Sequence, residues 1–416
     1  MDKQTSANGF SAEGLSAIGP MLQGVVDAGD LSGAVTLVWR KGSDVQFNAV
    51  GKRDIEAGKP MTRDTLFRIA SMTKPITAVA AMMLVEEGKI ALTDPITKWL
   101  PEFADMKVLK DPAGPLSDTY PSPRAITVED LMTHRSGLAY GFTSTGAIGK
   151  AHEDALGAVL DSPHKEDEWL KRIASLPLTY PPGKQLHYSH STEVLGFLVG
   201  RASGKGYRAF IMERIFKPLG MNDTDFYVPK DKRDRAAVVY QQNAKTAALE
   251  PVPFPQYDSP PDYCAGGGGL ISTLDDYLRF ARMLLAGGEL DGTRILKRES
   301  VMDMRTNRLT DEQRAIPFLG MPLWAGQGFG LGLSVISEPD KHEWMGAGSK
   351  GSFGWPGAFG TWWQADPEKD MILIFLIQNY TPLTPDMVGQ AVTGARMGAR
   401  IACPMFQKIV YGALER

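Results

Sequence analysis

The sequence is poor in cysteine, in excess charge of either sign and in long apolar runs. Its 416 residues hold only 2 cysteines, Cys264 and Cys403, which excludes a disulfide framework. The net charge of −3 comes from 45 basic and 48 acidic residues that are well mixed, so nothing predicts a polyanion-binding protein. The longest apolar run, 75–85, is too short to cross a bilayer, and the amino terminus has no apolar signal core. We therefore expect a cytoplasmic protein that binds neither nucleic acid nor a membrane.

Strand patterns lie near both ends of the chain, with helical patterns between them. A hairpin is predicted over 33–51, and short β-rich segments return at 329–337, 342–346, 358–365 and 371–378. This order predicts the α+β class, with one antiparallel sheet flanked by helices and a mostly helical insertion. We assign residues 1–94 and 265–416 to a discontinuous sheet domain and 95–264 to the helical domain. The active site is expected between the two.

Four helices are predicted from apolar periodicity and from capping residues. The first, over 71–87, is apolar on nearly every face and should lie inside the protein. The second begins near Thr127, with Asp130 three residues later, and should stop at Gly137. The others are a helix over 191–202, followed by glycine, and a closing helix over 384–415.

Ser71 and Lys74 stand at the start of the apolar helix. Residues three apart share one helix face and lie within reach of each other. A serine hydroxyl is a weak nucleophile that needs a base, and a buried lysine can either take its proton or hold a positive charge beside another base. In the first turn the Ser71 N–H lacks an intrahelical partner, so it can donate to a developing oxyanion. The alternative is that Ser71 only caps the helix and that Lys74 is solvated.

The same spacing occurs at Ser162 and Lys165, in a polar stretch that no apolar helix follows. Only the helix at Ser71 can remove Lys74 from water, so the context favours Ser71 as the nucleophile. No G-x-S-x-G segment is present, which excludes the nucleophile elbow of an α/β-hydrolase.

Several segments carry a family resemblance that spans about residues 15–395. These segments are FRIASMTK with PIT (67–77), LMTHRSGL (131–138), PG with YS five residues on (182–189), GGGGLIST (266–273) and FGLG (329–332). Together they resemble the serine β-lactamase and penicillin-binding-protein superfamily. Within it the chain is most similar to the class C β-lactamase-like esterases, the family VIII carboxylesterases, with related acyltransferases close by.

The resemblance implies that Tyr188 works with Lys74 on the proton of Ser71. Tyr188 precedes the helix predicted over 191–202, and both a helix start and an ammonium favour phenolate over phenol. Which of the two groups takes the proton stays open, because they titrate as a coupled pair. Tyr180 is the rival tyrosine, but it precedes the PG pair that leads into the motif.

Two positions depart from the β-lactamase pattern. His190 stands where β-lactamases have asparagine, which weakens recognition of a β-lactam amide. In the third motif we take Trp355 as the equivalent of the β-lactamase lysine, and the Ala358 N–H as the second oxyanion donor beside Ser71. Lys350 offers another register for this motif. The residues expected to bind substrate are Trp355, Gly357, His190, Phe353 and Phe359.

These features predict a serine hydrolase that cleaves carboxylic esters with short-to-medium, apolar acyl groups through an acyl-enzyme on Ser71. The alternatives are a β-lactamase, an amidase, an acyltransferase or a penicillin-binding sensor that stays acylated. His187 and His190 with Glu193 also fit a metal-ligand spacing, but a histidine pair with one carboxylate is a weak pattern. We therefore expect no metal and no cofactor.

Overall fold

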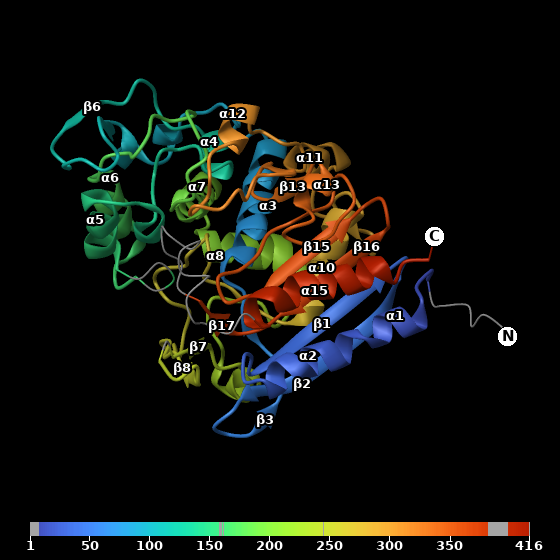
Figure 1. Cartoon of the computed structure of the whole chain (residues 1–416). Coiled ribbons are helices and arrows are strands. Elements are labelled where there is room, and N and C mark those ends of the chain that lie inside the picture. The colour runs from blue at the N-terminus through green and yellow to red at the C-terminus, as the bar shows by residue number, and fades with distance from the viewer. Residues whose placement is uncertain (1–7, 158–159, 161, 244, 382–397, 416) are drawn as a thin grey trace.

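An antiparallel sheet at the centre of the molecule joins the two ends of the chain (Figure 1). The computed structural model describes residues 8–157, 160, 162–243, 245–381 and 398–415. Within them the sheet has the strand order β12-β13-β14-β15-β16-β1-β2-β3. The strands are β1 (Gly33–Arg40), β2 (Ser43–Asp54), β3 (Lys59–Pro60), β12 (Gln327–Phe329), β13 (Ser334–Ile336), β14 (Phe353–Gly354), β15 (Trp362–Asp366) and β16 (Met371–Leu376). The predicted α+β class with an antiparallel sheet is confirmed.

The central strands β1 and β16 are buried on both faces, and their side chains alternate between two cores. Val35 and Leu37 face the larger core, which also contains α3 (Thr73–Glu86). Ala34 and Val38 face the other core, which the first and last helices cover. The helices that contact the sheet are α2 (Ile18–Asp27), α10 (Leu274–Leu285) and α15 (Gly398–Gly412), and α1 (Ala12–Ser16) packs on α2 and α15.

Most of the helical part lies at the upper left of Figure 1, away from β1 and β2. Its helices are α4 (Val128–Met132), α5 (Ala147–Leu156), α6 (Glu166–Ala174), α7 (Ser191–Ser203), α8 (Tyr207–Ile211) and α9 (Lys217–Leu219). Helix α7 packs against α3, α4 and α8. This packing brings the loop before α7 close to the turn before α3.

Short elements complete the described chain. The small strands are β4 (Phe67–Arg68) with β9 (Ile271–Ser272), β5 (Lys107–Leu109) with β6 (Thr119–Pro121), β10 (Glu289–Leu290) with β11 (Thr293–Arg294), and β17 (Asn379–Tyr380) with β7 (Tyr240–Gln242) and β8 (Leu249–Pro251). The short helices are α11 (Arg298–Met304), α12 (Asp311–Arg314) and α13 (Pro339–His342). Among the described strands, the main sheet takes none from 95–264, although β7 and β8 pair with β17.

Several predicted boundaries are wrong, each for a local reason. Residues 342–346 are not a strand, because α13 extends to His342 and a turn follows it. The stretch 329–337 is split into β12 and β13, and Gly332 turns the chain at a φ of +83°. The strand expected from Ala358 begins only at β15, after a turn in which Gly360 has a φ of +80°.

Two helices differ from prediction in length. Helix α4 has the expected Thr127–Asp130 capping box but ends at Met132 rather than at Gly137. His134 has left the helix by then, with a φ of +52°. The closing helix is α15, and 384–397 of its predicted range lies outside the described residues.

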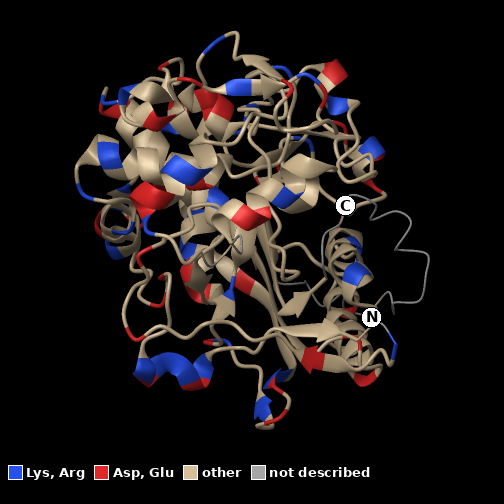
Figure 2. Cartoon of the chain, turned by 90° about the vertical axis from the view of Figure 1, so that its left-hand side faces the viewer, with Lys and Arg blue, Asp and Glu red and all other residues tan. Residues whose placement is uncertain are grey.

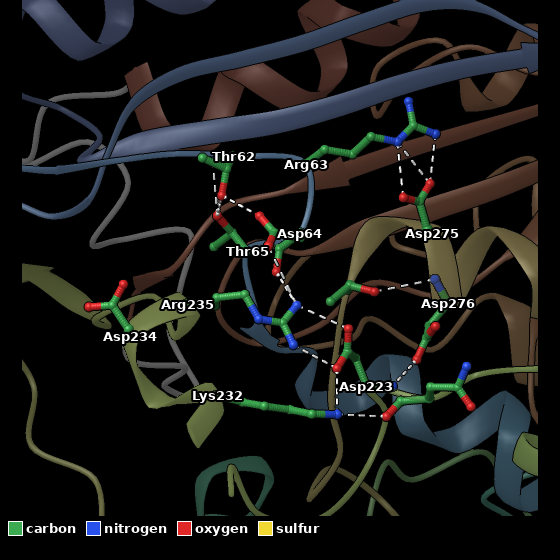
Figure 3. A network of polar contacts seen from close by, with 12 residues as sticks. Thr62, Arg63, Asp64, Thr65, Asp223, Lys232, Asp234, Arg235, Asp275 and Asp276 are labelled. Carbon is green, nitrogen blue, oxygen red and sulfur yellow. Dashed lines mark hydrogen bonds and ion pairs between the residues drawn. The ribbon is translucent and has the colours of Figure 1, made fainter. Parts of the chain in front are cut away.

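A network of charged side chains connects the loop before β4 to 222–235 and to α10 (Figure 3). Arg63 donates three hydrogen bonds to the Asp275 carboxylate, and Arg235 donates two to Asp223. The Asp276 carboxylate accepts from the backbone N–H of Asp223. Each pair alone stabilises little at a partly exposed position. Together they hold the segment that leads through β4 to Ser71.

Charges of both signs are interspersed over the face shown in Figure 2. This pattern agrees with the nearly balanced composition of the sequence. Within the described part of the chain, no helix has the length and apolar character needed to span a bilayer.

Candidate active site

Ser71 lies in a tight turn that is held in place from several sides. A 3₁₀ turn, Ala70–Met72, precedes α3, and Ala70 has a φ of +44°, which is a strained conformation for a residue with a Cβ. Thr361 Oγ1 donates to the Ile69 carbonyl over 3.1 Å, and Tyr277 donates to the Met72 carbonyl over 2.9 Å. Ser71 itself is half-buried, so its hydroxyl can be reached.

Lys74 is the buried cation of the site, with only 1% of its surface exposed. Its Nζ donates to Ser71 Oγ over 3.1 Å, to the Gly267 carbonyl over 2.6 Å and to Tyr140 over 3.3 Å. The three N–H groups of an ammonium thus have three acceptors. The alternative in which Lys74 is solvated is wrong, because α3 is buried along nearly its whole length.

Tyr188 reaches Ser71 from the loop before α7. Its hydroxyl lies 2.7 Å from Ser71 Oγ, and Lys74 Nζ lies 4.6 Å from the centre of its ring. Tyr180, the rival, has its ring against His187 instead. The structure therefore brings Ser71, Lys74 and Tyr188 into one hydrogen-bonded group.

The third motif approaches Ser71 through Trp355 and Gly357. The Trp355 indole N–H donates to the Tyr188 hydroxyl over 3.3 Å, whereas Lys350 is exposed. A Cβ on Gly357 would lie 2.4 Å from the Ile69 carbonyl, so only glycine allows this approach. Ala358 packs against the apolar cluster that contains Ala70. This packing puts the Ala358 backbone near the turn that carries Ser71.

Two apolar walls flank the group. One contains Tyr188 and is formed by Tyr140, Leu186, Leu309, Trp324, Phe329 and Trp355. The other contains Phe359 and is formed with Ala70, Val239, Leu160, Phe254 and Tyr380. A cleft beside this second wall is lined in part by Arg68, Leu160, Phe254 and Gly269. An acyl group on Ser71 would therefore have apolar side chains on both sides.

Two predicted substrate-binding residues have their side chains elsewhere. The Phe353 ring lies in the large core, edge-on to Trp363 at 5.8 Å and beneath the guanidinium of Arg305. The His190 ring lies behind Tyr140, with ring centres 4.4 Å apart, and it also contacts Trp169.

The two histidines of the possible metal motif diverge. His187 contacts Ser144 over 3.2 Å, while His190 faces Tyr140. In the described ranges, no three His, Cys, Asp or Glu side chains form a group that could hold a metal ion.

Three further residues support the group, and sequence patterns did not identify their roles. Tyr140 and Glu193 lie next to Lys74, with the Tyr140 hydroxyl 2.8 Å from a Glu193 oxygen. His134 packs its ring 4.7 Å from that of Tyr188, and burial together with the Lys74 charge pushes its pKa well below 6.5. Glu193 had a detectable signal, because it is the only carboxylate in the apolar sequence of α7.

The arrangement can carry out nucleophilic acyl chemistry. The half-buried Ser71 hydroxyl lies within hydrogen-bond reach of Lys74 and Tyr188, two groups that can serve as a base when deprotonated. Together the fold and the site define a serine hydrolase.

Comparisons with known proteins identify the family. The model of the family described as Beta-lactamase matches residues 20–392, and the chain belongs to that family. An uncharacterized protein of Mycobacterium tuberculosis (strain CDC 1551 / Oshkosh) is 51% identical over 393 residues, covering 94% of this chain and 96% of its own length. Esterase EstB of Burkholderia gladioli is 33% identical over 370 residues, covering 83% of this chain and 86% of its own.

The fold is also that of a solved structure. EstCE1, described as a hydrolase with promiscuous acyltransferase activity, superposes with a TM-score of 0.78 at 24% identity. The match covers 96% of this chain and 99% of EstCE1. The predicted resemblance to β-lactamase-like esterases is therefore confirmed.

Proposed function

We propose that the protein is a serine carboxylesterase of the family VIII type, which cleaves uncharged esters with short-to-medium apolar acyl groups. The observation that carries the proposal is the position of Ser71 Oγ, 2.7 Å from the Tyr188 hydroxyl and 3.1 Å from Lys74 Nζ. The esterase relative from Burkholderia gladioli supports an ester as the substrate.

The reaction proceeds in two halves. Ser71 Oγ forms a bond to the ester carbonyl carbon while its proton passes to the Tyr188 oxygen, which acts as a phenolate beside the Lys74 ammonium. The carbonyl oxygen becomes an oxyanion that accepts hydrogen bonds from the N–H groups of Ser71 and Ala358. The C–O bond to the alcohol then breaks, and the departing alkoxide takes the proton from Tyr188.

Water completes the cycle. It attacks the acyl carbon of the Ser71 ester and gives one proton to the Tyr188 oxygen. The bond between Ser71 Oγ and the acyl carbon breaks, Ser71 regains its proton, and a carboxylic acid leaves. The atoms balance with water as the only co-reactant.

The apolar walls favour an uncharged ester over a β-lactam. Trp355 stands beside Tyr188 where the resemblance places a lysine in β-lactamases, so this side offers no cation to a substrate carboxylate. The His190 side chain is buried behind Tyr140 and is not available to bind an amide near Ser71.

The experiment is turnover of p-nitrophenyl butyrate by the wild type and by Ser71→Ala, with nitrocefin as a parallel substrate. Ser162→Ala is the matched control, because it removes the serine of the other S-x-x-K motif, whose hydroxyl donates to the Leu156 carbonyl. Ester turnover that is lost in Ser71→Ala and retained in Ser162→Ala supports the proposal, provided that nitrocefin is cleaved slowly or not at all.

Other outcomes contradict the proposal. Activity that survives in Ser71→Ala would show that another residue is the nucleophile. A wild type that cleaves nitrocefin faster than the ester would make the protein a β-lactamase. An acyl adduct on Ser71 that persists in water, or that moves only to an added alcohol, would favour a sensor or an acyltransferase.

A further inference from the structure

A hydrogen-bonded chain runs from Ser71 through Lys74 and Tyr140 to a buried carboxylate. Lys74 Nζ lies 3.3 Å from the Tyr140 hydroxyl, which lies 2.8 and 3.0 Å from the two oxygens of Glu193. An ammonium only donates and an ionised carboxylate only accepts, so the direction of the chain follows. Lys74 donates to Tyr140, and Tyr140 donates to Glu193.

The Glu193 carboxylate is completely buried and has no strong cationic partner of its own. Among the described ion pairs, its only partner is His190, at 4.0 Å. Burial pushes the pKa of His190 well below 6.5, with smaller contributions from His152 and Lys74, so this imidazole is neutral. The positive charge that Glu193 faces is therefore the one on Lys74, reached through the phenol of Tyr140.

Burying a carboxylate is costly, and this one lies in an otherwise apolar helix. Burial raises the pKa of Glu193, while the Lys74 ammonium and the Tyr140 hydroxyl oppose that change and favour the ionised form. A carboxylate that only stabilised α7 would not need a link to Lys74. Its placement points to a role in the site.

Gly267 contacts both Lys74 and Glu193. Its carbonyl accepts from Lys74 Nζ over 2.6 Å, and a Cβ on it would lie 2.4 to 2.5 Å from the carboxyl atoms of Glu193. Glycine at this position thus lets Lys74 and the carboxylate contact the same stretch of backbone.

We infer that Glu193 is a positioning residue, which acts through Tyr140 to keep the Lys74 ammonium directed at Ser71 Oγ. This role rests on the proposed function of Ser71 as the nucleophile. Lys74 has four rotatable side-chain bonds, and three fixed acceptors leave it one orientation. Without the carboxylate, the Tyr140 hydroxyl is free to rotate, and Lys74 loses one of the partners that hold it.

The test compares Glu193→Gln, Tyr140→Phe and the double variant with the wild type. Glutamine keeps the size of the side chain, so the fold is preserved. It removes the charge and replaces one of the two oxygens that face the Tyr140 hydroxyl with an amide donor, so the hydrogen-bonded chain is weakened. Asp130→Asn is the matched control, because Asp130 is a buried carboxylate whose partners are Arg124 and the start of α4.

Two measurements distinguish a positioning role of Glu193 from a role in stability, and one of them does not depend on an ester being the substrate. One is the rate at which a p-nitrophenyl phosphonate labels Ser71, and the other is kcat and KM for p-nitrophenyl butyrate. We expect Glu193→Gln and Tyr140→Phe each to lower the labelling rate and kcat by about 10- to 100-fold, with KM within about threefold. The double variant should lose about as much as one single variant, because both changes break the same chain.

Four results would overturn the inference. Losses that multiply in the double variant would show that Glu193 acts independently of Tyr140. A change in KM alone would assign Glu193 to substrate binding, and an equal loss in Asp130→Asn would reduce its role to stability. A wild type that is neither labelled nor active overturns both proposals. A wild type that is labelled but does not cleave esters contradicts only the ester substrate, because the labelling rates still test Glu193.

Discussion

The hydroxyl of Tyr188 lies 2.7 Å from Ser71 Oγ, although 117 positions separate the two residues in the sequence. The contact exists because α7 packs against α3, so that the loop before one helix meets the first turn of the other. Trp355 donates to the same phenol from the sheet side of the site. Tyr188 thus connects groups from the two parts of the molecule.

The first prediction concerns this hydroxyl. Tyr188→Phe keeps the ring in its apolar wall but removes the group beside Ser71 Oγ. A positioned acid or base contributes about 10²- to 10⁴-fold to a rate, so we expect kcat/KM for p-nitrophenyl butyrate to fall by that range. Steady-state kinetics measure the loss, and a thermal melt shows whether the fold is intact.

Tyr180→Phe is the control for this prediction. Tyr180 lies in the same loop region, but its ring packs against His187. We expect its activity to stay within about twofold of the wild type, as for most substitutions away from a special contact. Equal losses in the two variants would show that the tyrosine beside Ser71 has no special role.

Local sequence patterns could predict the buried helix and the proximity of Ser71 and Lys74, whereas the family resemblance was needed to assign Ser71 as the nucleophile. Residues at i and i+3 meet on any helix, and an apolar helix must be buried, so this part of the site depends on no distant contact. Tyr188 and Trp355 required the family resemblance, because their distance from Ser71 is set by how α3, α7 and the sheet pack together.

Sequence patterns did not predict the surroundings of three side chains, those of Phe353, His190 and Glu193. Phe353 and Trp355 are two residues apart in an extended segment, yet they belong to different apolar clusters. No pattern indicates that His190 faces away from Ser71 or that Glu193 lies near Lys74. Such assignments depend on tertiary packing, which a motif does not encode.

The second prediction concerns the close approach of Gly357 to the turn of Ser71. In Gly357→Ala, the new Cβ would lie 2.4 Å from the Ile69 carbonyl and 2.2 Å from Thr361 Oγ1, so the backbone must move. This shift displaces Ala358 relative to Ser71, and a misplacement of about 1 Å can cost about 10²-fold in rate. We expect kcat to fall by about 10- to 100-fold, measured with p-nitrophenyl butyrate.

Gly24→Ala is the matched control for this change. A Cβ on Gly24 would meet nothing within 4 Å, and the residue lies inside α2. Alanine favours a helix over glycine by about 1 kcal/mol, so Gly24→Ala should raise the melting temperature and leave kcat unchanged. If Gly357→Ala also keeps its kcat, the approach of Gly357 is not needed for the reaction.

The third prediction concerns stability at acidic pH and the buried His152 of α5. Burial lowers the pKa of His152 to about 4, from 6.5 in the unfolded chain, with a smaller effect of His187. Between these two values the unfolded chain binds a proton that the folded protein does not bind. The free energy of unfolding therefore decreases as the pH falls from about 6.5 to about 4.

The contribution of His152 to this decrease is about 2 to 3 kcal/mol at pH 4.5, since one pKa unit corresponds to about 1.4 kcal/mol. Urea titrations of the wild type and of His152→Gln at pH 7 and pH 4.5 measure it. We expect the variant to lose about 2 to 3 kcal/mol less than the wild type on acidification, whatever its stability at pH 7.

His164→Gln serves as the control, because the His164 side chain is only half-buried, and it should retain the decrease seen in the wild type. A His152→Gln variant with the full decrease would mean that other groups, such as His187, whose pKa burial also lowers to about 4, account for the loss.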